Sequence, residues 1–274
     1  MDSQFVVKKD TTISDRQKQF LLAHHKHHHF ISLTRLLLLI IFLGAWEVSA
    51  GMGWIDTFFF SSPSGIIRYL YQMFLDHSVY QHTGITLLET IISFLLVTVF
   101  SLASATLLWY HNSLSEVLEP YLVVLNSLPK SALAPLLIVW LGTGTNTIIV
   151  AGISVAVFGS IISLYTGFCQ ADPETLKLIY TLGGTRKDAL CKVILPSSIP
   201  LILSNMKVNI GLSLVGVIIG EFLAARRGLG YLIIYGSQVF QLNMVITSIL
   251  ILCFIAMVFY KLIQSAEHYY RKKK

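Results

Sequence analysis

A polar segment with paired glycines, DPETLKLIYTLGGTRKDALCKVILP, occupies residues 172–196 between two long apolar runs. Glycine-rich turns cradle phosphates when a lysine and a hydroxyl residue follow at fixed spacing. The chain contains neither a GxxxxGK sequence followed by serine or threonine nor an LSGGQ-like stretch. Gly183 and Gly184 therefore do not indicate a phosphate cradle, and we expect that the chain itself does not hydrolyse ATP.

Ionisable side chains within the apolar runs are the second group that could do chemistry. Glu47, Glu89 and Glu221 can couple ions to transport or form part of a gate. We expect Glu221 to be hydrated at the outer membrane boundary, with an outer gate as the alternative, whereas for Glu47 and Glu89 both interpretations stay open. Gly216 and Gly220 have GxxxG spacing, which favours close helix packing.

Lys130 lies between Pro129 and Pro135 in the third apolar run. A lysine at the centre of a membrane helix costs about 2.5–3.5 kcal/mol on insertion scales. We expect it in the cytoplasmic half of this run, with its amine reaching the interface; a gate or pathway residue is the alternative. The two prolines would free backbone groups that a translocation cavity could use.

Cysteines and histidines are the remaining candidates for metal or redox chemistry. Cys169, Cys191 and Cys253 form no CxxC pattern, so we expect free thiols that are partly buried. The run HHKHHH at residues 24–29 lacks the ordered spacing of a structural metal site. We predict no metal, no other cofactor and no catalytic residue.

The composition indicates a membrane protein. Hydrophobic residues make up 54% of the 274 residues, charged residues only 12%, and the mean hydropathy is +0.70. A soluble domain of this length would need more charge on its surface. Apolar runs of about 20 residues can each cross the hydrocarbon core as a helix. We predict an all-α polytopic membrane protein with about six transmembrane helices.

The expected organisation begins with a cytoplasmic tail at residues 1–32 and a first span at 33–53. An external loop with an interfacial helix follows at 54–83. A core at 84–264 holds the other spans, and a basic tail occupies 265–274. The spans of the core are expected at residues 84–110, 120–142, 145–168, 204–224 and 242–263.

Lysine and arginine are distributed unevenly among the loops. With both termini in the cytoplasm, the outer loops carry only Arg68, Arg226 and Arg227. The positive-inside rule therefore predicts this orientation. Orientation and anionic lipid account for the net charge of +6, and no nucleic-acid partner is needed.

The segment 172–196 begins with the signals of a short helix. Asp172 and Pro173 are typical of a helix start, and Glu174 places negative charge at its N-terminus. We expect one apolar face, made of Leu176, Ile179, Tyr180 and Leu182.

A second helix is expected after a glycine corner. Gly183 or Gly184 would supply the left-handed residue that ends the first helix. Thr185 and Asp188 fit a capping box, and Pro196 would prevent simple continuation. The two helices would form a rigid elbow, which must rest on the membrane domain or on a partner because it is too small to be stable alone.

This spacing resembles the EAA loop in the membrane permeases of ATP-binding-cassette (ABC) importers, which has a glycine, nine residues, a branched aliphatic residue, one residue and Leu-Pro. Gly183, Val193 and Leu195–Pro196 occupy these positions, whereas Lys177, Leu178 and Ile179 replace the Glu-Ala-Ala that names the loop. Further segments resemble the nitrate/sulfonate/taurine branch of the family. They are residues 61–67, 128–144, 220–222 and 228–233.

The resemblance implies a type I ABC importer permease in the cell (inner) membrane. Its implied partners are two ABC ATPase subunits, a second permease copy in a homodimer, an extracytoplasmic substrate-binding protein and the lipid bilayer. The implied substrate is a small nutrient, such as a sulfonate, taurine, nitrate, a vitamin or a pyrimidine precursor.

The resemblance also implies two groups of site residues. The first helix of the elbow would insert into a groove on the ATPase. The coupling residues would be Asp172, Pro173, Glu174, Lys177, Gly183, Gly184, Arg186, Lys187, Leu195 and Pro196. Possible pathway or gate residues are Pro129, Lys130, Pro135 and Glu221.

A self-sufficient secondary transporter or channel is the main alternative. It would use the intramembrane carboxylates for ion coupling and show a repeat between its halves. No convincing repeat is visible in the sequence, and such a protein has no use for the elbow.

Overall fold

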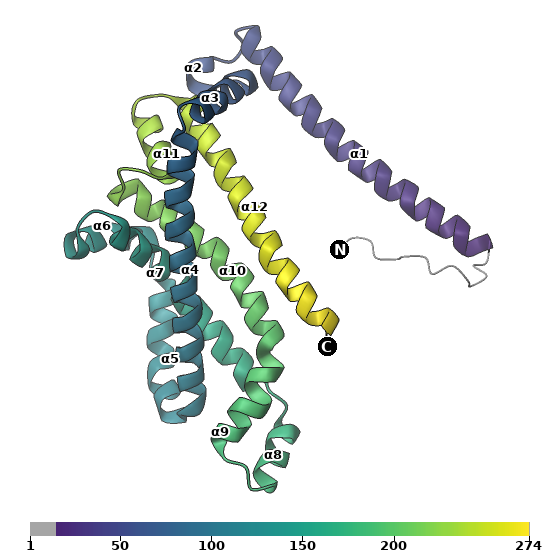
Figure 1. Cartoon of the computed structure of the whole chain (residues 1–274), viewed down its shortest axis with the longest axis vertical. Coiled ribbons are helices and arrows are strands. Elements are labelled where there is room, and N and C mark those ends of the chain that lie inside the picture. Colours follow the sequence, from purple (N-terminus) through teal and green to yellow (C-terminus); the bar gives the residue numbers. More distant parts are fainter. Residues whose placement is uncertain (1–14, 274) are drawn as a thin grey trace. The chain divides into compact units, whose positions relative to one another are not determined.

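The computed structural model describes the backbone of residues 15–273 and the side chains from Phe30 onward, except those of residues 32, 271 and 273. The start of the expected tail at residues 1–14, the side chains of the histidine run at 24–29 and Lys274 lie outside the described residues. Within the described range, every regular element is a helix (Figure 1). The chain divides into two units, residues 1–64 and 65–274.

The first unit consists of α1 (Asp15–Gly51) and α2 (Thr57–Phe60). The portion Leu33–Gly51 of α1 is long and apolar enough to cross a membrane. At its end, the Glu47 carboxylate accepts the backbone N–H of Ser64 at 3.0 Å. This carboxylate therefore meets one of the N–H groups that the start of the next helix leaves without an intrahelical acceptor.

Four long helices form the bundle of the second unit (Figure 1). The helix α7 packs against both α4 and α10, and α12 packs against α10. We call the end where α8 and α9 lie the elbow end, and the end near α11 the far end. The helices of this unit are α3 (Pro63–Leu75), α4 (Ser78–Tyr110), α5 (Asn112–Ser127), α6 (Lys130–Leu141), α7 (Thr145–Cys169), α8 (Pro173–Thr181), α9 (Arg186–Ala189), α10 (Leu195–Ala224), α11 (Leu229–Gln238) and α12 (Leu242–Lys273).

The described chain has five helices that could each cross a membrane, or six spans if the bent pair α5 and α6 counts as one. The expected third span over residues 120–142 falls on this bent pair, so it is not one straight helix. The helices α5 and α6 meet at an angle of 96°. Leu128 is extended, with ψ of 137°, because a residue that precedes a proline avoids the helical region, and Pro129 then caps α6.

The helices α7 and α10 approach closely at glycines, which confirms the expected packing through the GxxxG spacing. A Cβ atom on Gly216 would lie 2.7 Å from the Cα of Gly152 and 2.9 Å from the carbonyl oxygen of Ala151. A Cβ on Gly220 would lie 2.9 Å from the Cα of Ile148. Because these neighbours are backbone atoms, they cannot move aside as a side chain can.

A single added methyl group tests this packing. We expect Gly216→Ala to destabilise the protein by about 1–3 kcal/mol, the usual cost of overpacking, and to lower its thermal unfolding midpoint in detergent by several degrees. The matched control is Gly211→Ala in the same helix, where an added Cβ meets nothing within 4 Å. Equal midpoints for the two variants would contradict the close contact.

Candidate functional site

The first helix of the elbow is held at its start by Asp172. The carboxylate accepts the backbone N–H groups of Glu174 at 3.1 Å and Thr175 at 3.2 Å, so the predicted N-cap is confirmed. The Thr175 hydroxyl also donates to it at 2.5 Å. These donors, with the Thr175 hydroxyl contributing most, hold the pKa of Asp172 below its ordinary value. The cap is therefore ionised at neutral pH.

The corner of the elbow uses its two glycines for different reasons. Gly183 has φ of +79°, so it is the left-handed residue that ends α8. Gly184 has no such backbone, but a Cβ there would lie 2.6 Å from Cγ2 of Ile179 and 2.8 Å from its carbonyl oxygen. The N–H of Gly184 donates to that same carbonyl at 2.9 Å. The chain therefore turns tightly back onto the end of α8.

The predicted capping box at the start of α9 is confirmed. The Thr185 N–H donates to the Asp188 carboxylate at 2.9 Å, and the Asp188 N–H donates to the Thr185 hydroxyl at 3.3 Å. Lys192 forms an ion pair with Asp188 at 2.8 Å, one helical turn further along. The restart of the helix after the glycine corner is thus fixed by local contacts.

The helical run continues past Pro196, but it does so through a π-helical turn, so the continuation is not a simple α-helix. The segment from Arg186 to Ala224 is one helical run, in which a π-helical turn at Leu190–Ile194 joins α9 to α10. In this turn the N–H of Leu195 donates to the carbonyl of Leu190, five residues back. The wider turn accommodates the proline, which lacks an N–H, in the first turn of α10. The elbow is therefore continuous with α10.

The two faces of α8 differ from the expected division. Leu176 and Ile179 pack against a buried cluster at the elbow end, to which α4, α7 and the π-helical turn contribute. Tyr180 and Leu182, which we expected on that same face, are exposed, Leu182 to 76%. Leu178 is also exposed. The helix therefore rests on the bundle by one face and presents an apolar surface on the other.

The remaining residues predicted for this site lie around that surface or beneath it. Pro173, Glu174, Lys177 and Lys187 are exposed. Arg186 is half-buried and turned toward the end of α4, where it bonds the backbone carbonyl of Trp109 at 2.6 Å. Leu195 is half-buried against the elbow cluster, and Pro196 is exposed.

Lys130 lies at the start of α6, at the bend between α5 and α6. Its amine donates to the carbonyl of Leu125 and lies 5.2 Å from the ring centre of Phe158. Phe158 is in the middle of α7, so the amine is at mid-depth of the bundle. The expectation that Lys130 reaches the cytoplasmic interface stays a prediction, as does the alternative of a gate or pathway residue. Pro129 caps α6, and Pro135 lies inside it.

Glu221 is fully buried at the far end of α10, so the expectation that it is hydrated is wrong. Its carboxylate accepts the Thr86 hydroxyl of α4 at 2.7 Å and the backbone N–H of Gly230 at 2.5 Å. Cβ atoms on Gly228 and Gly230 would collide with this carboxylate. The glycines of the segment GLGYLI thus make room for Glu221.

Glu89 adds a second carboxyl to this buried group. It is 1% exposed and lies within hydrogen-bonding reach of Thr145 and of Glu221. His82 completes the group, because its Nδ1 accepts the N–H of Gly228 at 3.0 Å. We call His82, Thr86, Glu89 and Glu221 the far-end latch, since they join α4, α10 and the start of α11.

Two polar contacts between the helices escaped the sequence analysis. The side-chain amides of Asn205 and Asn209 on α10 donate to the Ser160 hydroxyl of α7 at 2.6 and 2.9 Å. Lys207 on α10 forms an ion pair with Glu267 on α12. Lys207 could have been noticed, since it lies inside the expected fifth span, where a lysine needs a partner.

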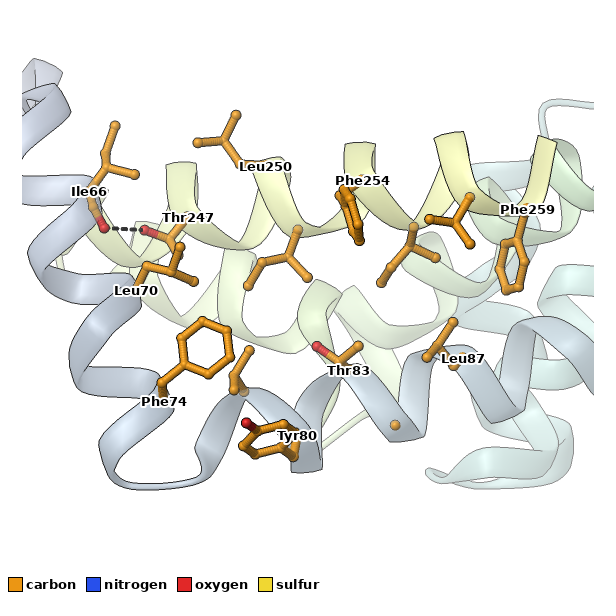
Figure 2. A pocket seen from close by; sticks show the side chains of 15 residues that line it. Ile66, Leu70, Phe74, Tyr80, Thr83, Leu87, Thr247, Leu250, Phe254 and Phe259 are labelled. Carbon is orange, nitrogen blue, oxygen red and sulfur yellow. Dashed lines mark hydrogen bonds between the residues drawn. The ribbon is translucent and has the colours of Figure 1, made fainter. Parts of the chain in front are cut away.

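An apolar groove of about 600 Å³ lies between α3, α4 and α12 (Figure 2). The side chains that line it include Phe74, Leu87, Leu250 and Phe254, and none of the lining residues is charged. A sulfonate or another oxyanion needs cations or N–H donors. The groove therefore has the chemistry of a surface that contacts hydrocarbon, and it does not suit an anionic substrate.

The three cysteines are free thiols, as expected, but they are exposed and not partly buried. Among the described residues, no three histidine, cysteine, aspartate or glutamate side chains are grouped so that they could hold a metal ion.

Residues 97–269 match the protein family described as binding-protein-dependent transport system inner membrane component. A probable ABC transporter permease protein of Haemophilus influenzae is 31% identical over 227 residues, which cover 82% of this chain and 91% of that protein. A putative aliphatic sulfonates transport permease protein of Bacillus subtilis is 26% identical over 79% of this chain and 78% of its own length.

Among solved structures, a chain of the MetNI methionine ABC transporter in inward-facing conformations has a similar fold. The TM-score is 0.61 at 18% identity, and the match covers 71% of this chain and 94% of that one. At this level of identity the likeness concerns the fold alone.

The role of Asp172 in holding α8 can be tested by hydrogen exchange. We expect Asp172→Ala to speed amide exchange in α8 about tenfold, because the first N–H groups of the helix lose their acceptor. Asp172→Asn, which keeps a good capping side chain, is the control. Because the pKa is lowered, acid should abolish the effect only below the ordinary pKa of aspartate. Unchanged exchange in Asp172→Ala would contradict this role.

Proposed function

Because the chain belongs to the family of binding-protein-dependent transport system inner membrane components and is thus an ABC importer permease subunit, we propose that a separate ATPase drives it through the elbow. It is a multi-pass membrane protein, and its likeness to the sulfonate permease confirms the expected branch. The observation that carries the proposal is the elbow itself: α8 has an exposed face, and a tight glycine corner joins it to α9, which continues into α10.

The surface of α8 has the properties of a docking surface for a soluble partner. Leu178 and Leu182 expose apolar area beside Glu174 and Lys177, which carry opposite charges. Apolar side chains supply affinity in an interface, and charged neighbours fix the register of the partner. In this proposal α8 enters a groove on the ATPase, and Asp172 and Lys187 lie at the edge of the contact.

The other partners follow from the same assignment. The pathway would lie between two copies of this permease, with two ATPase subunits on the cytoplasmic side and a substrate-binding protein on the outer side. Both termini and the elbow would be cytoplasmic, as the distribution of lysine and arginine predicts. Pro129, Lys130, Pro135 and Glu221 are the residues proposed for the pathway or gate.

We propose a small sulfonate-like nutrient as the substrate. The likeness to an aliphatic sulfonate permease supports this class. The amine of Lys130, at mid-depth of the bundle, is a cation that could attract such an anion during passage. The broader class includes nitrate, vitamins and pyrimidine precursors, which the sequence resemblance also implies.

The glycine corner provides the test of coupling. We expect Gly183→Val to lower ATP-driven uptake of labelled taurine or an alkanesulfonate at least about tenfold, because a left-handed backbone costs roughly 1–2 kcal/mol or more with a branched side chain. Gly183→Asn should keep more activity, since asparagine tolerates this backbone. The variants are compared at equal amounts in membrane vesicles. Full uptake with Gly183→Val would contradict the mechanical role of the elbow.

The alternative of a secondary transporter makes a different prediction for the far-end latch. Glu221→Gln keeps the shape of the side chain but removes its ionisation, so uptake that is driven by ATP should stay within about twofold. Glu221→Leu leaves the buried N–H of Gly230 without an acceptor, and we expect a loss of stability of about 1–3 kcal/mol. If Glu221→Gln instead abolished uptake and the wild type took up substrate without any ATPase, the alternative would be correct.

A further inference from the structure

Arg186 is a residue of the elbow whose side chain bonds the corner between α4 and α5. One of its terminal nitrogens, Nη2, donates to the carbonyl of Trp109 at 2.6 Å and to the side-chain oxygen of Asn112 at 2.5 Å. Both hydrogens of this nitrogen are therefore used. Trp109 belongs to the last turn of α4 and Asn112 to the first turn of α5, so the guanidinium spans the corner between the two helices.

The end of α4 favours a cation at this position. The last four carbonyls of a helix lack intrahelical donors, and they carry the negative end of the helix dipole. The carbonyl of Trp109 is one of them. The guanidinium also lies 5.3 Å from the ring centre of Trp109, within the range of a cation–π interaction. The arginine thus donates hydrogen bonds to the end of α4, places its positive charge at the negative end of the helix dipole and stacks its flat face near the Trp109 ring.

The helix α5 leads from this corner to the bend at mid-depth. Lys130 holds the C-terminal end of α5, because its amine bonds the carbonyl of Leu125 and faces Phe158 of α7. The helix α5 is therefore bonded near its start by Arg186 of the elbow and near its end by Lys130. The elbow is linked covalently to α7 and α10, α5 packs against α7, and Arg186 bonds the first turn of α5 directly.

We propose that Arg186 is a positioning residue that fastens the elbow to the corner between α4 and α5, so that a displacement of α8 also moves α5. This rests on the proposed function, because the displacement comes from the ATPase. In this proposal Arg186 bonds within the chain, whereas its exposed neighbour Lys187 contacts the ATPase. Lysine would not replace the arginine, since an ammonium lacks the flat face and the fork of donors.

The test uses the full complex of this chain with its ATPase, purified from cells that express both. Hydrogen exchange is measured with and without nucleotide trapped by vanadate, a readout that needs no substrate. In the wild type, trapping should change exchange in α5, α7 and α10. In Arg186→Met we expect the change in α5 to shrink about threefold or more, the range in which side chains along a coupling path act. The changes in α7 and α10 should persist.

Further variants separate this role from others. Arg186→Lys should behave like Arg186→Met, and Arg68→Met, which removes an exposed charge from α3, should respond as the wild type. Lys187→Met should weaken co-purification of the ATPase without uncoupling α5. Asn112→Ala removes one acceptor of the guanidinium, so it should reduce the response of α5 only in part. The double variant Asn112→Ala with Arg186→Met should be no worse than Arg186→Met alone.

The outcomes distinguish the inference from the function on which it rests. If trapped nucleotide changed exchange nowhere in the wild-type chain, the proposed coupling to an ATPase would fail. Suppose instead that the wild type responded and that the change of exchange in α5 were as large in Arg186→Met and Asn112→Ala as in the wild type. Only the positioning role would then fail. Loss of the ATPase from the Arg186→Met complex would also overturn it, because Arg186 would then belong to the docking surface.

Discussion

The continuous helical run from Arg186 to Ala224 is the feature on which the rest of the structure depends. In hydrocarbon, each backbone N–H and C=O must be bonded within the protein. Pro196 and Pro200 have no N–H to donate, yet the run continues past both after a π-helical turn at Leu190–Ile194. The helix α8 is joined to this run by the glycine corner, and its inner face packs on the bundle through Leu176 and Ile179. A movement of α8 would therefore reach the bundle through the corner and through this packing.

The contact between α7 and α10 extends this connection to the other side of the elbow. The glycines at residues 152, 216 and 220 bring the backbones so close that a methyl group has no room. The amides of Asn205 and Asn209 bond across the same interface to Ser160. Since α7 leads into the elbow and α10 leaves it, both connections belong to one packed pair. Such a pair is suited to a rigid-body movement between two packed states.

The features that the sequence predicted correctly depend on neighbours in the chain. The cap at Asp172, the left-handed Gly183 and the box of Thr185 and Asp188 each need only three or four residues. The surroundings of Arg186 and Glu221, which were not predicted, depend on partners far away in sequence. Arg186 meets Trp109 at a separation of 77 residues, and Glu221 meets Thr86 at 135. Hydropathy marks Glu221 as a boundary residue, but only the fold supplies the donors that allow its burial.

The helices α4 and α10 are joined at both ends, and this arrangement determines what can move. At the elbow end Arg186 bonds the last turn of α4, and at the far end Glu221 bonds Thr86 near its start. Trp109 lies 23 residues beyond Thr86 in α4, so about 35 Å of helix separates these contacts. Two helices tied at such a distance cannot slide or splay without breaking a buried contact at one end. A push on the elbow should therefore turn α4, α7 and α10 together as one body.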